Sequence, residues 1–170
     1  MSYERILVKW NELDGLLREF DLKDSSTPGL RREVQIAHIL GHFVHKTKHG
    51  PDAYNPLNEN ERYEYLCSQI GYCVQMDRID LTNVRTRIEK NSKIYAVFFT
   101  LGAVARIYEV ETQSFLLSAI DKINRHMERA AKRGKPWIGK HIGWTEKEIS
   151  KLKSVKVYEK NAGIGPSGAG

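Results

Sequence analysis

The sequence predicts an α/β fold in which a mixed central β-sheet is flanked by helices. Apolar residues recur at steps of three and four over residues 4–22, which is the spacing of an amphipathic helix. Two short runs rich in β-branched and aromatic residues, 93–100 and 104–110, are typical of buried strands. Because helical and extended segments alternate along the chain, we expect helices on both faces of the sheet.

Capping and turn residues predict where the other elements begin and end. Thr112 or Ser114 can cap a long helix that runs to about Lys132. Thr145 is followed three residues later by Glu148, which is the spacing of a capping box. In chain order we predict a helix over 4–22, a helix over 30–45, a strand over 61–68, a helix over 82–91, strands over 93–100 and 104–110, a helix to 132, a loop over 137–144, a short helix from 145 and a strand over 154–159. Residues 69–81 fit no single pattern.

Length and composition limit the class of protein. A chain of 170 residues is the size of one domain, predicted over residues 1–162 and followed by a Gly-rich, flexible tail over 163–170. No apolar run approaches the roughly 18 residues of a membrane helix, and the N-terminus lacks the features of a secretory signal. Two cysteines, Cys67 and Cys73, cannot form a disulfide scaffold. We therefore expect a cytoplasmic protein without a membrane partner.

The basic charge is concentrated near the C-terminus. The chain has a net charge of +6, yet residues 122–160 alone contain 12 Lys and Arg against 4 Asp and Glu, a net of +8. The rest of the chain is therefore slightly acidic. This distribution indicates a polyanionic partner, with nucleic acid as the first candidate, or else a well-solvated helix face.

Two carboxylates flank a predicted turn. Asp52 follows Pro51 at the point where the chain leaves a helix, and Glu64 comes twelve residues later in a predicted strand. If residues 52–54 and 61–68 pair as a hairpin, both carboxylates can bind one divalent cation. Mg²⁺ prefers such hard oxygen ligands and keeps positions for water and substrate phosphate.

Pro51-Asp52 followed by Glu64-Tyr65-Leu66 resembles the motif of the PD-(D/E)xK nucleases, the core of most type II restriction endonucleases. Glu33, in a predicted upstream helix, is similar to a Glu that members of this family often carry. The two predicted strands over 93–110 and the helix after them resemble the second half of the same fold.

The resemblance implies a restriction-endonuclease-like fold and a type II site-specific deoxyribonuclease of a bacterial or archaeal restriction–modification system. It implies that Asp52 and Glu64 bind Mg²⁺ and that Glu33 is a supporting carboxylate. Sequence-specific hydrolysis of duplex DNA by a homodimer is the expected activity, because a twofold protein matches a palindromic site.

Position 66 departs from the family motif, because Leu66 stands where the family has Lys. In the family this amine contacts the scissile phosphate and the attacking water, and leucine can do neither. Three interpretations remain open: an inactivating change, an amine supplied from Lys46, Lys48 or Lys90, or a natural DNA binder without catalysis. With Leu66 we expect weak or no cleavage and retained binding of DNA and metal.

Two basic segments are candidate DNA contacts. One follows the motif strand, and the other combines cations with Trp137 near the end of the long helix. The candidate residues are Arg78, Arg85, Arg87, Arg125, Arg129, Lys132, Arg133, Lys135, Lys140 and His141.

The histidines suggest a function of another class. His38, His42, His45 and His49 fall at steps of four and three, so a single helix would place them on one face. A metal-storage or interaction protein could use that stripe, although a half-exposed polar stripe without a ligand is favoured. No nucleophile elbow or nucleotide-binding motif is present in the sequence. A non-catalytic DNA-binding protein on the same fold and a structure-specific repair nuclease also fit the sequence.

Overall fold

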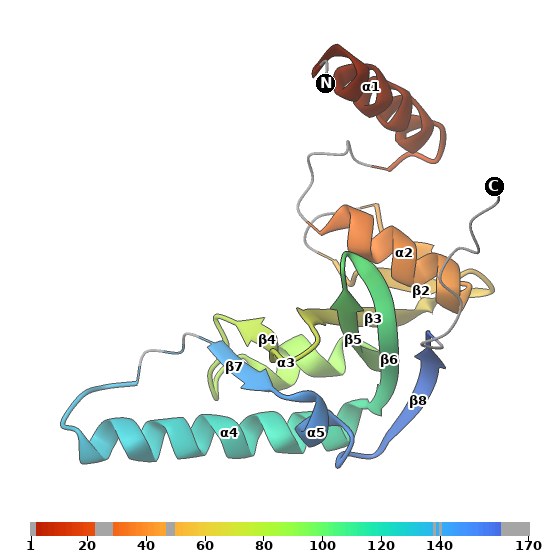
Figure 1. Ribbon diagram of the computed structural model, residues 1–170. Coiled ribbons are helices and arrows are strands. Elements are labelled where there is room, and N and C mark those ends of the chain that lie inside the picture. The colour runs from red at the N-terminus through yellow and green to blue at the C-terminus, as the bar shows by residue number, and fades with distance from the viewer. Residues whose placement is uncertain (1–2, 23–28, 47–49, 138, 140, 161–170) are drawn as a thin grey trace. The chain divides into compact units, whose positions relative to one another are not determined.

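A computed structural model describes residues 3–22, 29–46, 50–137, 139 and 141–160 (Figure 1). The chain divides into two compact units, Met1–Glu64 and Tyr65–Gly170, where the sequence predicts one domain over 1–162. The boundary falls inside a long strand, so each unit contains part of it. The tail predicted over 163–170 lies outside the described residues.

Every predicted helix and strand is present in the predicted order, and the strands β1 and β4 were not predicted. The helices are α1 (Tyr3–Glu19), α2 (Leu30–Leu40), α3 (Val84–Glu89), α4 (Thr112–Lys132) and α5 (Glu146–Ile149). The strands are β1 (Phe43–Val44), β2 (Ala53–Asn55), β3 (Asn58–Gln69), β4 (Val74–Asp77), β5 (Lys93–Thr100), β6 (Ala103–Glu111), β7 (His141–Trp144) and β8 (Ser154–Glu159).

The larger sheet is mixed, as predicted. It has six strands in the order β1-β2-β3-β5-β6-β8, and β1 with β2, β2 with β3, β5 with β6 and β6 with β8 pair antiparallel. The Tyr65 ring of β3 lies 5.9 Å from the Tyr95 ring of β5, and Ile70 N–H donates to the carbonyl oxygen of Phe99 at 2.9 Å. The later residue on the β3 side thus contacts the later residue of β5, so the two strands run parallel.

The second helix is shorter than predicted. The helix expected over 30–45 ends at Leu40, because Gly41 adopts a left-handed conformation with φ 69°. His42 N–H then donates to the carbonyl oxygen of Ala37 at 2.9 Å, which closes the helix end. The apolar spacing continues past Gly41, so periodicity alone extends the helix too far.

The core of the second unit lies between the sheet and α4. Strand β5 is buried on both faces, with five consecutive residues from Ile94 to Phe98 at most 3% exposed. A strand buried on both faces has a continuous apolar sequence, and the prediction of a buried strand over 93–100 is confirmed. The residues that α4 buries are Phe115, Leu116, Ala119 and Ile123.

The prediction of a loop over 137–144 is wrong for its last four residues. Residues His141–Trp144 form β7, which pairs antiparallel with β4 in a separate two-stranded sheet. Trp144 is fully buried; its ring lies 4.4 Å from the Phe115 ring and its Nε1–H donates to Ser118 Oγ at 2.8 Å. Gly143 suits this position, since a Cβ there would meet the Cys73 side chain at 3.1 Å.

No helix in the described part of the chain is long and apolar enough to cross a membrane.

Candidate functional site

In the first unit, β1, β2 and the first part of the long strand β3 form an antiparallel meander. Phe43 of β1 pairs with Tyr54 of β2, and Ala53 of β2 pairs with Tyr63 of β3. The hairpin predicted between residues 52–54 and 61–68 is therefore confirmed. It was predictable because turn-forming residues separate two extended runs.

Asp52 is fixed by backbone hydrogen bonds to both neighbouring strands. Its N–H donates to the carbonyl oxygen of Tyr63 at 2.9 Å, and its carbonyl oxygen accepts from His45 N–H at 2.8 Å. Glu64 is the residue after Tyr63, and both acidic residues are half-buried. The fold thus brings Asp52 and Glu64 to adjacent backbone positions.

Polar side chains share one face of β2 and β3. Tyr54 pairs with Arg62, so both point to the same face, and Glu64 follows Arg62 by two residues on that face. The Tyr54 ring lies 6.0 Å from the His45 ring, edge to face. A pocket of about 460 Å³ lies here, lined by His45, Lys46, Tyr54, Glu59, Asn60 and Arg62.

Arg62 is a candidate that the sequence prediction missed. Arg62 is exposed and lies on the same face of β3 as Glu64. A cation two residues before a strand carboxylate is the signal that could have identified it, since alternate residues share a face.

Leu66 has a structural role that the motif did not suggest. It is 5% exposed and belongs to the apolar core of the second unit, together with Met76, Ile94 and Phe115. A lysine here would have to desolvate its ammonium group or extend it past its neighbours to water. The fold therefore explains the leucine as a packing residue.

Of the three lysines that could replace the missing amine, the structure describes Lys46 and Lys90. Lys46 Nζ pairs with Asp21 Oδ2 at 2.6 Å, and the hydrogen bond and charge of Asp21 raise the pKa of Lys46. Lys46 also lines the pocket beside Tyr54. Lys90 is exposed at the C-terminal end of α3 in the other unit, and Lys48 lies outside the described residues.

Glu33 lies at the start of its own helix. Its Oε1 is 2.9 Å from the position that a Cβ on Gly29 would occupy, so the carboxylate is directed toward the first turn of α2. Across the described ranges, no group of three or more His, Cys, Asp or Glu side chains is arranged to bind a metal ion. The role of Glu33 as a supporting carboxylate stays a prediction.

The pair of Asp52 and Glu64 still suits Mg²⁺. This ion is commonly bound through one or two carboxylates, with waters and substrate phosphates as the other ligands. Two hard oxygen donors on neighbouring strands, both partly accessible, meet that requirement.

The histidines do not form the helical stripe that the spacing suggested. His38 is exposed on α2, whereas His42 follows the helix and its ring lies 4.1 Å from the Tyr63 ring in a tilted arrangement. His45 follows β1, and His49 lies outside the described residues. Because α2 ends at Leu40, the three described histidines do not share a helix face.

Several candidate DNA contacts gather near the end of α4. The exposed cations there are Arg125, Arg129, Lys132, Arg133 and Lys135. Arg125 also pairs with Asp121 at 2.8 Å, one turn earlier on α4. Since this ion pair is exposed, it contributes little to stability and leaves the guanidinium accessible to solvent.

The candidates from the other basic segment have more varied surroundings. Arg85 pairs with Glu89 at 2.6 Å, and Arg78 is exposed with φ 51°. Arg87 is half-buried and donates to the carbonyl oxygens of Asp77 and Arg78, which gives it a structural role. His141 is exposed at the start of β7, and Lys140 lies outside the described residues.

His126 of α4 lies among several positively charged side chains. Its ring stacks on Trp137 with 6.1 Å between centroids. Burial lowers the pKa of His126, and the nearby charges of Arg129, Lys122 and His141 lower it further. The pKa of His126 is therefore lowered first by burial and then by the neighbouring cations.

No protein-family model matches this chain, and no curated protein matches its sequence.

Proposed function

We propose that this protein is a Mg²⁺-dependent endonuclease of the PD-(D/E)xK kind that acts on duplex DNA. The observation that carries the proposal is the backbone hydrogen bond from Asp52 to Tyr63, which brings Asp52 beside Glu64. The motif resemblance assigns the metal ligands to these two residues, and their adjacency in the fold supports that assignment.

The chemistry follows from what the meander residues offer. Asp52 and Glu64 supply two carboxylates to hold Mg²⁺, which would acidify a bound water and neutralise charge on the phosphate. Arg62 offers a guanidinium on the same face of the meander, suited to a phosphate oxygen. In this proposal Arg62 takes over part of the electrostatic role that the family's lysine has at position 66.

The basic end of α4 would bind the DNA backbone. Exposed Arg129, Lys132 and Arg133 can neutralise phosphates without reading the sequence. Sequence-specific cleavage and membership of a restriction–modification system belong to the same proposal and rest on the motif resemblance.

A second candidate function is DNA binding without catalysis. The burial of Leu66 at 5% exposure favours it, because the family's catalytic amine is replaced by a side chain that the core uses. In this second function the protein still binds DNA through its basic surface but does not hydrolyse it.

Binding of Mn²⁺, used as a paramagnetic substitute for Mg²⁺, tests the metal site. We expect the full chain with duplex DNA to bind Mn²⁺ in an electron paramagnetic resonance titration. Asp52→Asn should weaken binding at least about tenfold, because one of two carboxylate ligands is lost. Glu19→Gln, an exposed carboxylate of α1, is the matched control. Equal Mn²⁺ affinity in Asp52→Asn and the parent chain would contradict the assignment.

A further inference from the structure

An apolar stripe runs along α1. Ile6, Trp10, Leu13, Leu17 and Phe20 follow one another at steps of four, three, four and three, which is a heptad spacing. Four of them remain accessible: Ile6 and Leu13 are each 42% exposed, Trp10 is 56% and Phe20 is 71%. Soluble proteins rarely leave such a contiguous apolar stripe to water, so its exposure indicates a partner.

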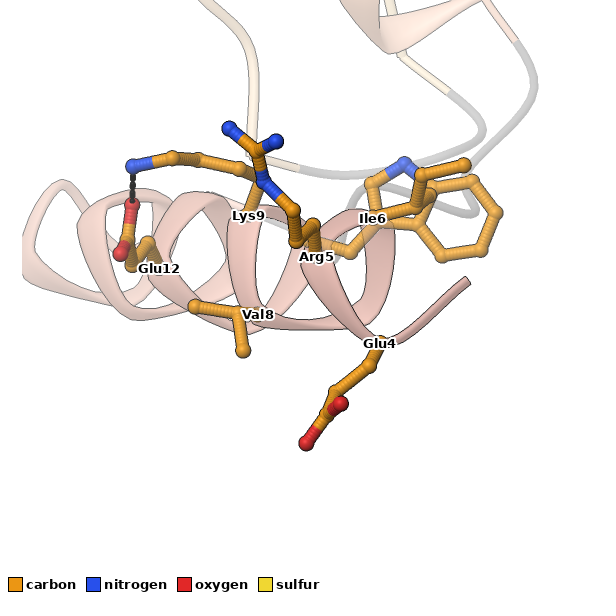
Figure 2. A pocket seen from close by; sticks show the side chains of 7 residues that line it. Glu4, Arg5, Ile6, Val8, Lys9 and Glu12 are labelled. Atoms are coloured by element: carbon orange, nitrogen blue, oxygen red, sulfur yellow. Dashed lines mark hydrogen bonds and ion pairs between the residues drawn. The ribbon is translucent and has the colours of Figure 1, made fainter. Parts of the chain in front are cut away.

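An open depression lies between side chains on the surface of α1. It has a volume of about 620 Å³, and its seven lining residues, Ile6, Val8 and Trp10 among them, all belong to α1 (Figure 2). Figure 2 shows Val8 pointing away from Ile6, and Lys9 pairs with Glu12 at 2.6 Å. Val8 thus lies outside the stripe, although it is 49% exposed.

The charges beside the stripe suit a second copy of the same helix in parallel orientation. With Trp10 and Leu17 at positions a, Lys9 falls at position g and Asp14 at position e. In a parallel pair, position g faces position e of the partner five residues further on, so Lys9 faces Asp14 of the second copy, twice by symmetry. An antiparallel pair would place Lys9 beside Leu16 and Asp14 beside Leu7, which brings no opposite charges together at these positions.

A membrane surface fits α1 less well than a second helix. The helix has three basic and four acidic residues, whereas helices that lie on anionic membranes are rich in Lys and Arg. Lys9 also pairs with Glu12 at 2.6 Å, so part of the positive charge of α1 is compensated within the helix.

We propose that α1 is the dimerisation helix of this protein and forms a parallel two-stranded coiled coil with α1 of a second copy. Ile6, Trp10, Leu13 and Phe20 form the exposed seam, and Leu17, which is 9% exposed, packs within the chain beside it. The inference stands on α1 alone and does not depend on the proposed endonuclease function.

Sedimentation velocity of the full chain over a range of concentrations tests the proposal. We expect a dimer whose dissociation constant rises on the order of 100-fold or more in Trp10→Glu, because a buried Trp anchor is lost in both copies. Val8→Glu adds the same charge at a similarly exposed apolar position outside the stripe and should leave the dimer unchanged. Helix content by circular dichroism checks that both variants fold.

Charge exchange tests the orientation of the pair. Lys9→Glu should weaken the dimer roughly two- to tenfold, since carboxylates then face each other, and adding Asp14→Lys should restore it. A monomeric parent chain, a Trp10→Glu variant that still dimerises, or loss of the dimer in Val8→Glu would each overturn the proposal. Absence of rescue in the double variant would overturn the parallel orientation.

Discussion

The backbone N–H of Asp52 donates a 2.9 Å hydrogen bond to the carbonyl oxygen of Tyr63, across the gap between β2 and β3. The bond holds the carboxylate-bearing residue beside Glu64 without using either side chain. The backbone therefore sets where Asp52 lies, and in the proposed site its side chain is a metal ligand.

Asp52→Asn is accordingly expected to preserve the meander. The two backbone bonds to Tyr63 and His45 remain, and the amide has nearly the size of the carboxylate, so the free energy of unfolding should change by at most about 1 kcal/mol. Urea denaturation measures it. A loss of several kcal/mol would mean that the Asp52 side chain is structural, and effects of this variant on metal binding could then not be assigned to a lost ligand.

The basic end of α4 should determine the salt dependence of DNA binding. Replacing Arg129 and Lys132 by Ala should reduce the slope of log K against log salt by about 0.9 per lost phosphate contact. Fluorescence anisotropy with a labelled duplex measures this slope. Lys151→Ala removes an exposed cation outside the predicted contact set and is the control. Equal slopes in the Arg129 and Lys132 variants and the parent would show that the DNA lies elsewhere.

We expect His126 to make the free energy of unfolding depend on pH. Burial, Arg129, Lys122 and His141 lower its pKa in the folded protein below the ordinary value of 6.5. The unfolded chain therefore binds the proton more readily as the pH falls, and stability is lost from about pH 6.5 downward through the folded pKa. In His126→Gln this loss should be smaller, as measured by the midpoint of thermal unfolding at pH 5 to 8. An identical pH profile in the two proteins would contradict this role of His126.

The capping box at Thr145 stabilises the short helix α5. Thr145 Oγ1 accepts from Glu148 N–H at 3.2 Å, and Glu148 Oε2 accepts from Thr145 N–H at 2.8 Å. Thr145→Ala should lower the free energy of unfolding by about 1 kcal/mol, and Thr145→Ser should retain most of it. Chemical denaturation of the three proteins measures both effects. An equal decrease in the free energy of unfolding in the Ala and Ser variants would show that the Thr145 hydroxyl does not stabilise the helix.

Local chemistry predicts much of the fold. The cap at Thr145, the buried run of β5 and the hairpin that carries Asp52 all depend on residues close in sequence, and each is confirmed. The α/β class with a mixed sheet follows from the order of these elements.

The errors arise where distant contacts decide the structure. The sequence predicts a loop at Trp144 because four residues are too few for a strand pattern, and its strand exists through pairing with β4, far away in the chain. The end of α2 depends on the left-handed conformation of Gly41, against an apolar pattern that continues to Val44. The burial of Leu66 depends on residues of β4, β5 and α4, so the motif alone could not indicate a packing role.

Cleavage of a long duplex DNA in the presence of Mg²⁺ tests the central claim most directly. The assay compares the parent chain with Leu66→Lys, Leu66→Met and Asp52→Asn, each checked for folding by circular dichroism. We predict slow cleavage into discrete fragments by the parent chain and by Leu66→Met, because neither has an amine at position 66. If the ammonium group of Leu66→Lys extends past its core neighbours to the carboxylates, that variant should cleave faster by a factor of about 10² to 10³, and Asp52→Asn should not cleave. A folded Leu66→Lys variant that cleaves no DNA, or cleavage that persists in Asp52→Asn, would contradict the account.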